Sequence, residues 1–143
     1  MSELQTKIKL YCEANKKTAV IGIGGNVTIR NDTDGKGDYI ESWTVDGLTK
    51  PTDKQLASYT DWETRKGLDE LRPIRNKLLQ QSDWVVIKER EEGGSVSNFA
   101  DWKTYRQALR DITSGLDTVA KVEEKLKQDK DGKLVNFPTA PSE

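Results

Sequence analysis

The sequence lacks histidine altogether and contains one cysteine, Cys12. Without histidine, the chain has neither the commonest general base nor the commonest metal ligand. A single cysteine forms no internal disulfide and no multi-thiolate metal centre. The Leu10-Tyr11-Cys12 context is typical of a small hydrophobic residue on an apolar face. We therefore expect a non-catalytic protein with no cofactor and no metal.

Long hydrophobic runs and a bias of charge are also missing. No run approaches the ~18 apolar residues of a membrane-spanning helix, and the N-terminus has no signal-peptide pattern. The 23 Lys and Arg residues nearly balance the 24 Asp and Glu residues, which gives a net charge of −1. The basic residues are spread along the chain, as on an ordinary solvated surface. We expect a protein that binds neither a membrane nor nucleic acid.

Two segments resemble ligand-binding loops but depart from them at the positions that matter. The run Gly22-Ile23-Gly24-Gly25 would need a glycine at position 27, where Val27 stands, to match a dinucleotide fingerprint. The run Asp32–Gly37 could begin a calcium loop, but Lys36 and Trp43 then occupy positions five and twelve, where oxygen ligands are required. The first segment is better explained by a strand or bulge and the second by a hairpin turn.

The first third of the chain predicts a helix followed by a small sheet. Ser2 is a plausible N-cap for a helix over residues 2–14. Residues 19–29 and 39–45 are rich in β-branched and aromatic types, and residues 31–38 are turn-forming. Two or three strands need a helix to cover one face. This part therefore predicts a small antiparallel β-unit with an N-terminal helix.

Pro51 marks the start of a helical region. Thr52 opens a capping box, and residues 53–81 have leucines near helical spacing. Pro73 lies within this stretch, and a proline inside a helix costs about 3 kcal/mol. We therefore predict a kink or break near Leu71–Arg72, with Pro73 in the first turn of the next segment.

A second helix follows a loop at residues 91–95. It begins near Ser97–Asn98, and its apolar stripe is Phe99, Trp102, Tyr105, Leu109 and Ile112. A further helix capped by Ser114 and Asp117 is expected before a tail that contains prolines. The chain thus predicts an α+β protein in three parts: residues 1–50 with the β-unit, 51–112 with a helical hairpin, and 113–143 with an extra helix and tail.

The hairpin carries the residue types that dominate interface hot spots, namely Trp, Tyr and Arg. Trp102 and Arg106 are four residues apart, so a cation–π contact worth about 0.5–1 kcal/mol is expected. Asp83, at the end of the first helix and beside a turn that bears Trp84, is placed to accept from an arginine or to cap that turn. These side chains either form a partner surface or only hold the hairpin together.

The hairpin segments resemble the phage tail assembly chaperone family. That family has an Arg-Asn…Leu-Leu helix, a Ser/Thr-Asp-Trp turn and a Trp-x-x-Tyr-Arg-x-x-Leu-Arg-Asp-Ile helix. The first helix and the turn are matched by Arg75, Asn76, Leu78, Leu79, Ser82, Asp83 and Trp84. The second helix is matched by Trp102, Tyr105, Arg106, Gln107, Ala108, Leu109, Arg110, Asp111 and Ile112. The similarity covers roughly residues 72–112.

The sequence departs from the family pattern in four places. Phe137 stands where a tryptophan is usual, and an extra helical stretch at 115–130 precedes the tail. The loop around Gly93-Gly94 lacks the usual Thr-Gln and Pro-Asp residues, and Pro73 precedes the first motif. These departures leave open whether the protein is released after assembly or stays in the particle.

The resemblance implies a protein that helps tail-fibre chains fold and trimerise. The partner would be a phage tail-fibre or other tail protein, met in the host cytoplasm during assembly, and the sequence leaves self-association open. A structural protein of the virion tail is the alternative, and a small hydrolase or regulatory enzyme is a third reading. An open strand edge of the β-unit offers a second route to a partner. The expected partner-binding residues are Arg75, Asn76, Asp83, Trp84, Trp102, Tyr105, Arg106, Arg110, Phe137 and Pro138.

Overall fold

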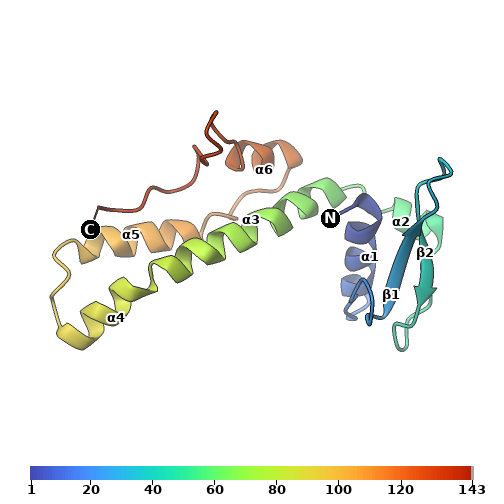
Figure 1. Cartoon of the computed structure of the whole chain (residues 1–143), viewed down its shortest axis with the longest axis horizontal. Helices are drawn as coiled ribbons and strands as arrows, with labels where there is room; N and C mark the ends of the chain where they lie inside the picture. The colour runs from blue at the N-terminus through green and yellow to red at the C-terminus, as the bar shows by residue number, and fades with distance from the viewer. Residues whose placement is uncertain (143) are drawn as a thin grey trace. The chain divides into compact units, whose positions relative to one another are not determined.

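A computed structural model, which describes residues 1–142, confirms the α+β class (Figure 1). The chain divides into two compact units, one formed by Met1–Lys66 and the other beginning at Gly67. Each unit has its own hydrophobic core. Within residues 1–142, no helix combines the length and the apolar character needed to cross a membrane.

Helix α1 (Glu3–Ala14) begins as the sequence predicts. The Ser2 hydroxyl accepts from the backbone N–H of Gln5, and the Gln5 side chain accepts from the Ser2 N–H. This reciprocal pair satisfies two of the N–H groups that a helix start leaves open. Ile8 and Tyr11 on one face are buried, together with Cys12. The covering helix that the β-unit requires is therefore present.

The sheet has two antiparallel strands, β1 (Val27–Asn31) and β2 (Asp38–Trp43). Thr28 pairs with Ser42 and Ile29 with Ile40, so Glu41 is the extra residue of a bulge in β2. The predicted strand at residues 19–29 is wrong for its first part. Ile21 forms only an isolated bridge with Val27, and residues 22–26 form a turn, because Gly22 and Gly24 adopt positive φ angles and fold the chain back.

The first unit closes over the sheet through α1 and the segment after β2. Its buried core consists of Ile8, Tyr11, Cys12, Val27, Ile40, Val45 and Leu56. The Tyr11 hydroxyl donates to the Thr49 carbonyl at 2.8 Å, and the Trp43 indole N–H donates to the Leu48 carbonyl at 2.7 Å. These bonds let two amphipathic rings enter a core that is otherwise apolar.

The break in the long helical region lies earlier than predicted. Helix α2 (Asp53–Ala57) is short, residues 58–61 are not helical, and α3 (Trp62–Gln81) then continues through Pro73. The prediction of a break near Leu71–Arg72 is therefore wrong. Leu71 is fully buried, so a break there would remove it from the core. Packing of the apolar face of α3 outweighs the cost of one exposed proline.

An unpredicted helix, α4 (Asp83–Glu92), follows α3 after a bend at Ser82. The expected turn at Trp84 is thus wrong, because Trp84 lies in the first turn of α4. The chain reverses at Gly93 and Gly94, which both adopt positive φ angles. Helix α5 (Phe99–Arg110) starts after Asn98 as predicted and runs back beside α4 and the later part of α3 (Figure 1).

Helix α6 (Val119–Lys125) is shorter than the predicted stretch at 115–130. Its N-cap is Thr118, whose hydroxyl accepts from the Lys121 N–H, so the predicted cap at Ser114 is wrong. The following tail returns along the unit, where Asn98 donates to the Ser142 carbonyl at 2.6 Å. The buried core of this unit comprises Leu71, Val85, Trp102, Tyr105, Leu109, Ile112 and Phe137.

Candidate functional site

The bend between α3 and α4 is the point where predicted site residues converge. The Ser82 side chain is 2% exposed, and its hydroxyl donates to the Leu79 carbonyl at 2.9 Å. A serine that bonds back to a carbonyl in the preceding turn competes with helix continuation. Asp83 then supplies a carboxylate in the first turn of α4, where the helix dipole favours negative charge.

Arg106 of α5 holds this bend. One terminal nitrogen of its guanidinium donates to the Leu79 carbonyl at 2.7 Å and to the Ser82 hydroxyl at 2.6 Å, and the other donates to Asp83 Oδ1 at 2.9 Å. The guanidinium thus satisfies a carbonyl at the C-terminal end of α3 and pairs with the start of α4. The prediction that Asp83 accepts from an arginine is confirmed.

The predicted cation–π contact between Arg106 and Trp102 is wrong. The guanidinium is engaged at the bend, and the side chain that lies over an aromatic ring is Lys103, which is 5.8 Å from the Phe99 centroid. Fixed hydrogen bonds to three acceptors stabilise Arg106 more than an exposed ring contact would.

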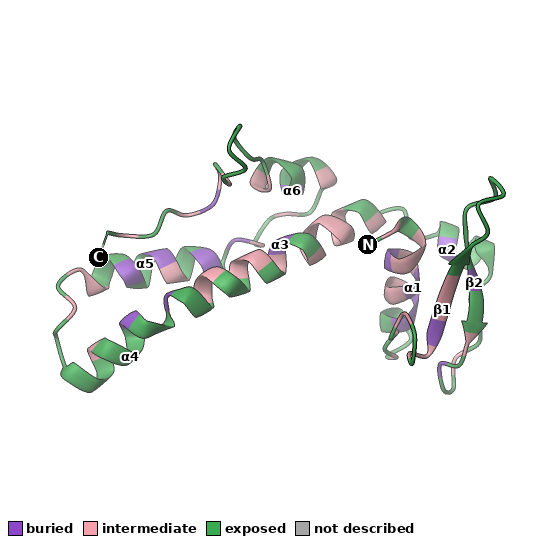
Figure 2. Cartoon of the chain, in the orientation of Figure 1, coloured by how far each residue is buried: buried purple, intermediate pink, exposed green. Residues whose placement is uncertain are grey.

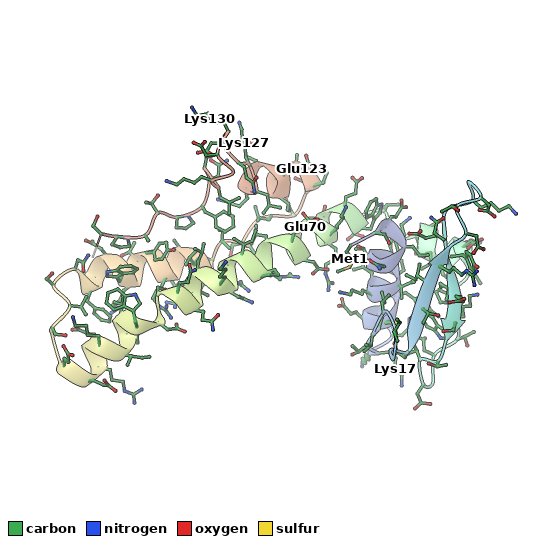
Figure 3. The ribbon with its side chains drawn as sticks, viewed as in Figure 1. Met1, Lys17, Glu70, Glu123, Lys127 and Lys130 are labelled. Carbon is green, nitrogen blue, oxygen red and sulfur yellow. The ribbon has the colours of Figure 1, made fainter. Side chains whose placement is uncertain are left out.

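Three aromatic rings pack edge to face beside the bend. Figure 3 shows that side chains fill the space between α4 and α5. The Trp84 and Trp102 centroids are 5.6 Å apart, and those of Trp102 and Tyr105 are 5.9 Å apart. Trp102 and Tyr105 are buried, and burial raises the pKa of the Tyr105 hydroxyl. Trp102 Nε1 is buried without a hydrogen-bond partner among the described residues. These two rings therefore anchor the hairpin from inside.

Helix α4 presents apolar side chains to solvent, and we call Trp84, Val86 and Ile87 the α4 surface. Their exposed fractions are 38%, 39% and 55%, whereas Val85 between them is fully buried. Figure 2 shows α4 largely in the colour of exposed residues. Successive helical residues are rotated by about 100°, so a run of four apolar residues cannot face one core. The fold leaves this apolar surface uncovered.

The other predicted site residues make local contacts or lie inside the unit. Arg75 Nε donates to Asn76 Oδ1, and Arg110 donates to Gln107, so these pairs stay within their own helices. Phe137 is buried in the core, and Pro138 beside it is half-buried. An open hollow of about 450 Å³ lies near Phe137, and its lining includes Ile112, Leu116 and Pro138.

Val86 and Ile87 are exposed residues of the site that are not among the predicted ones. The signal for them is the apolar run Trp84-Val85-Val86-Ile87. Four consecutive apolar residues also fit a short buried strand, so the pattern alone does not separate the two. Within the described residues, no group of three or more His, Cys, Asp or Glu side chains is placed to hold a metal ion.

The fold and these contacts define an α+β protein whose second unit is a helical hairpin, bent at Ser82 and fixed there by Arg106. Residues 68–124, which extend from α3 to α6, match the family model of the phage tail assembly chaperone protein. The match leaves out the whole of the first unit and covers less than half of the chain. No curated protein and no solved structure matches this chain.

Proposed function

We propose that the protein is a non-catalytic phage tail assembly chaperone that binds tail-fibre chains and shields their apolar surface until they trimerise. The match of residues 68–124 to the chaperone family supports this function. The observation that carries the binding role is the α4 surface, which lies inside the matched segment. The protein would bind these chains in the host cytoplasm during assembly.

The α4 surface is suited to hold apolar segments of another chain. The Trp84 ring is fixed edge to face against Trp102, so little side-chain entropy is lost when a partner covers it. Val86 and Ile87 stand on a helix whose buried Val85 ties it to the core. A rigid apolar surface of this kind binds with a smaller ordering cost than a flexible loop does.

The predicted site residues then take different roles in the proposal. Trp84 and Asp83 lie at the surface and would contact the partner. Trp102, Tyr105 and Arg106 are positioning residues, because they fix α4 against α5. Arg75, Asn76 and Arg110 stay candidate rim contacts, and Phe137 with Pro138 would act through the packing of the tail.

Co-expression with the tail-fibre polypeptide of the same phage tests the proposal. We expect wild-type protein to raise the amount of soluble, trimeric fibre, and Ile87→Asp to weaken fibre binding about tenfold, because a charge enters an apolar contact. Val135→Asp is the matched control, since Val135 is also exposed, at 49%, but lies outside α4. Fibre that is equally soluble and trimeric without this protein would contradict the function.

Mass spectrometry of purified particles distinguishes release from retention. A released chaperone should be absent from particles or present far below the fibre. Stoichiometric presence would instead indicate a permanent joint in the virion tail and would overturn the transient role.

A further inference from the structure

The loop of residues 20–26 in the first unit is held in one conformation by its own hydrogen bonds. The Asn26 side chain accepts from the Val20 N–H at 2.7 Å and donates to the Thr18 carbonyl at 2.9 Å. The Asn26 N–H donates to the Val20 carbonyl, and the Gly22 N–H donates to the carbonyl of Val27, which is fully buried. The loop is therefore anchored to the core at its base.

Glycine is required in this loop, and its tip carries an isoleucine. A Cβ at Gly25 would lie 2.0 Å from the Val20 carbonyl oxygen, so no other residue fits. Ile23 at the tip is fully exposed, and Val20 is 55% exposed. An isoleucine side chain has few rotamers, so it loses little conformational entropy when a partner covers it. Nothing in the fold of the unit accounts for its position.

Ile23 forms part of the wall of a groove. The open groove has a volume of about 450 Å³ and runs over β1 beside the start of α1. Ile21, Ile23 and Ile29 make its apolar part, and Arg30, Asp38 and Glu41 contribute charged groups. The groove thus combines an apolar strip with a charged rim.

The rim is anionic. Arg30 is occupied by two carboxylates, with Nε 2.7 Å from Asp32 and one terminal nitrogen 3.1 Å from Glu41. Across the hairpin from Arg30 to Glu41 the sequence has two cations, Arg30 and Lys36, and four carboxylates. The charge complementary to this rim is positive.

We propose that this groove binds a segment of the tail polypeptide that pairs an apolar side chain with Lys or Arg. The proposal rests on the proposed function, because it names the chemistry of a second contact with the same partner. A second contact on one chain raises overall affinity by raising the effective concentration of the partner segment. Ile23 supplies the apolar contact, and Asp38 and Glu41 supply the charge.

The groove fits a protein segment better than two other occupants. A second copy meeting only through these isoleucines would bury far less than the about 1,200 Å² that a specific stable complex needs. An anionic lipid surface would be repelled by the carboxylates of the rim. The experiment below would detect binding of either of these two occupants.

The test measures binding of the full chain to the tail-fibre polypeptide of the same phage, by titration at two salt concentrations. We expect Ile23→Ala to raise Kd about tenfold, because its buried contact is lost. Asp38→Asn with Glu41→Gln should weaken binding and reduce its dependence on salt. Asparagine at position 38 keeps an oxygen for the bond from Asn31, and glutamine at position 41 keeps one for the bond from Arg30, so both acceptors are retained. Val135→Ala is the control and should bind as wild type does.

The outcomes separate this inference from the proposed function. If Ile23→Ala binds as tightly as wild type while Ile87→Asp binds weakly, the groove assignment is wrong and the chaperone function stands. If the wild-type protein does not bind the fibre polypeptide, the groove assignment and the chaperone function are both wrong. A dimer in sedimentation that Ile23→Ala dissolves, or flotation with phosphatidylglycerol-containing vesicles that Ile23→Ala abolishes, would assign the groove to another occupant and overturn the proposal.

Discussion

Arg106 shows how one side chain can determine the geometry of the helical hairpin. It bonds a carbonyl at the C-terminal end of α3, the Ser82 hydroxyl and Asp83 of α4, although it belongs to α5. Its side chain is 14% exposed, so these bonds are largely protected from water. A planar guanidinium can serve several acceptors at once, whereas an ammonium is a single point charge.

Replacing Arg106 tests this role at the residue scale. We expect Arg106→Ala to lower the free energy of unfolding by about 2–3 kcal/mol, because the Leu79 carbonyl and Ser82 hydroxyl lose a charged donor. Arg106→Lys should recover only part of the loss. Asp83→Ala should cost less than about 1 kcal/mol, since Asp83 is 53% exposed. Urea unfolding followed by circular dichroism measures all three, and a larger loss for Asp83→Ala than for Arg106→Ala would refute the assignment.

At the scale of elements, a glycine lets α3 and α6 approach closely. A Cβ at Gly67 would lie 2.4 Å from Val122 Cγ1, and the Val122 side chain is 1% exposed. Gly67 lies inside α3, where glycine is normally unfavourable relative to alanine by about 1 kcal/mol. The close packing explains why an unfavourable helix residue stands there.

Substitution of Gly67 separates helix propensity from packing. The higher helix propensity of alanine should stabilise the fold by about 1 kcal/mol, but overpacking against Val122 should destabilise it by about 1–3 kcal/mol. We expect Gly67→Ala to lower Tm, and Gly67→Ala with Val122→Ala to be less destabilised than the two single effects combined. Thermal unfolding of the four proteins forms the cycle. Additive effects would show that the two side chains do not compete for the same space.

At the scale of the whole molecule, each unit buries a group whose acid dissociation is disfavoured. Burial, with a smaller contribution from Glu13, raises the pKa of the Cys12 thiol in the first unit above its ordinary value of 9.0. Burial likewise raises the pKa of Tyr105 in the second unit above 10.0. As the pH rises, each group therefore loses its proton at a lower pH in the unfolded chain than in the folded protein.

Alkaline pH should therefore destabilise the protein. Because the folded pKa values are the higher ones, the stabilisation is complete below the ordinary values and is lost as the pH rises through 9 to above 10. We expect Tm to fall between pH 8 and pH 11, with Cys12 alkylated slowly in the native state and rapidly in urea. A Tm that is constant over this range, or equal alkylation rates, would contradict the burial of these groups.

The sequence by itself determined the elements that depend on local chemistry. The capping boxes at Ser2 and Thr52, the start of α5 after Asn98 and the apolar stripe through Trp102, Tyr105 and Leu109 all follow from short-range patterns. A cap is satisfied within three residues, so its signal is complete in the sequence. The α+β class follows from the same local patterns.

Only the tertiary structure decided where the helices bend and which residues reach solvent. The fully buried Leu71 keeps α3 continuous through Pro73, and the bonds of Ser82 and Arg106 turn the expected reverse turn into the start of α4. The bond between Arg106 and Ser82 joins residues that are 24 positions apart, so no local pattern contains it. The same long-range packing buried Trp102 and Phe137 and left Trp84, Val86 and Ile87 exposed.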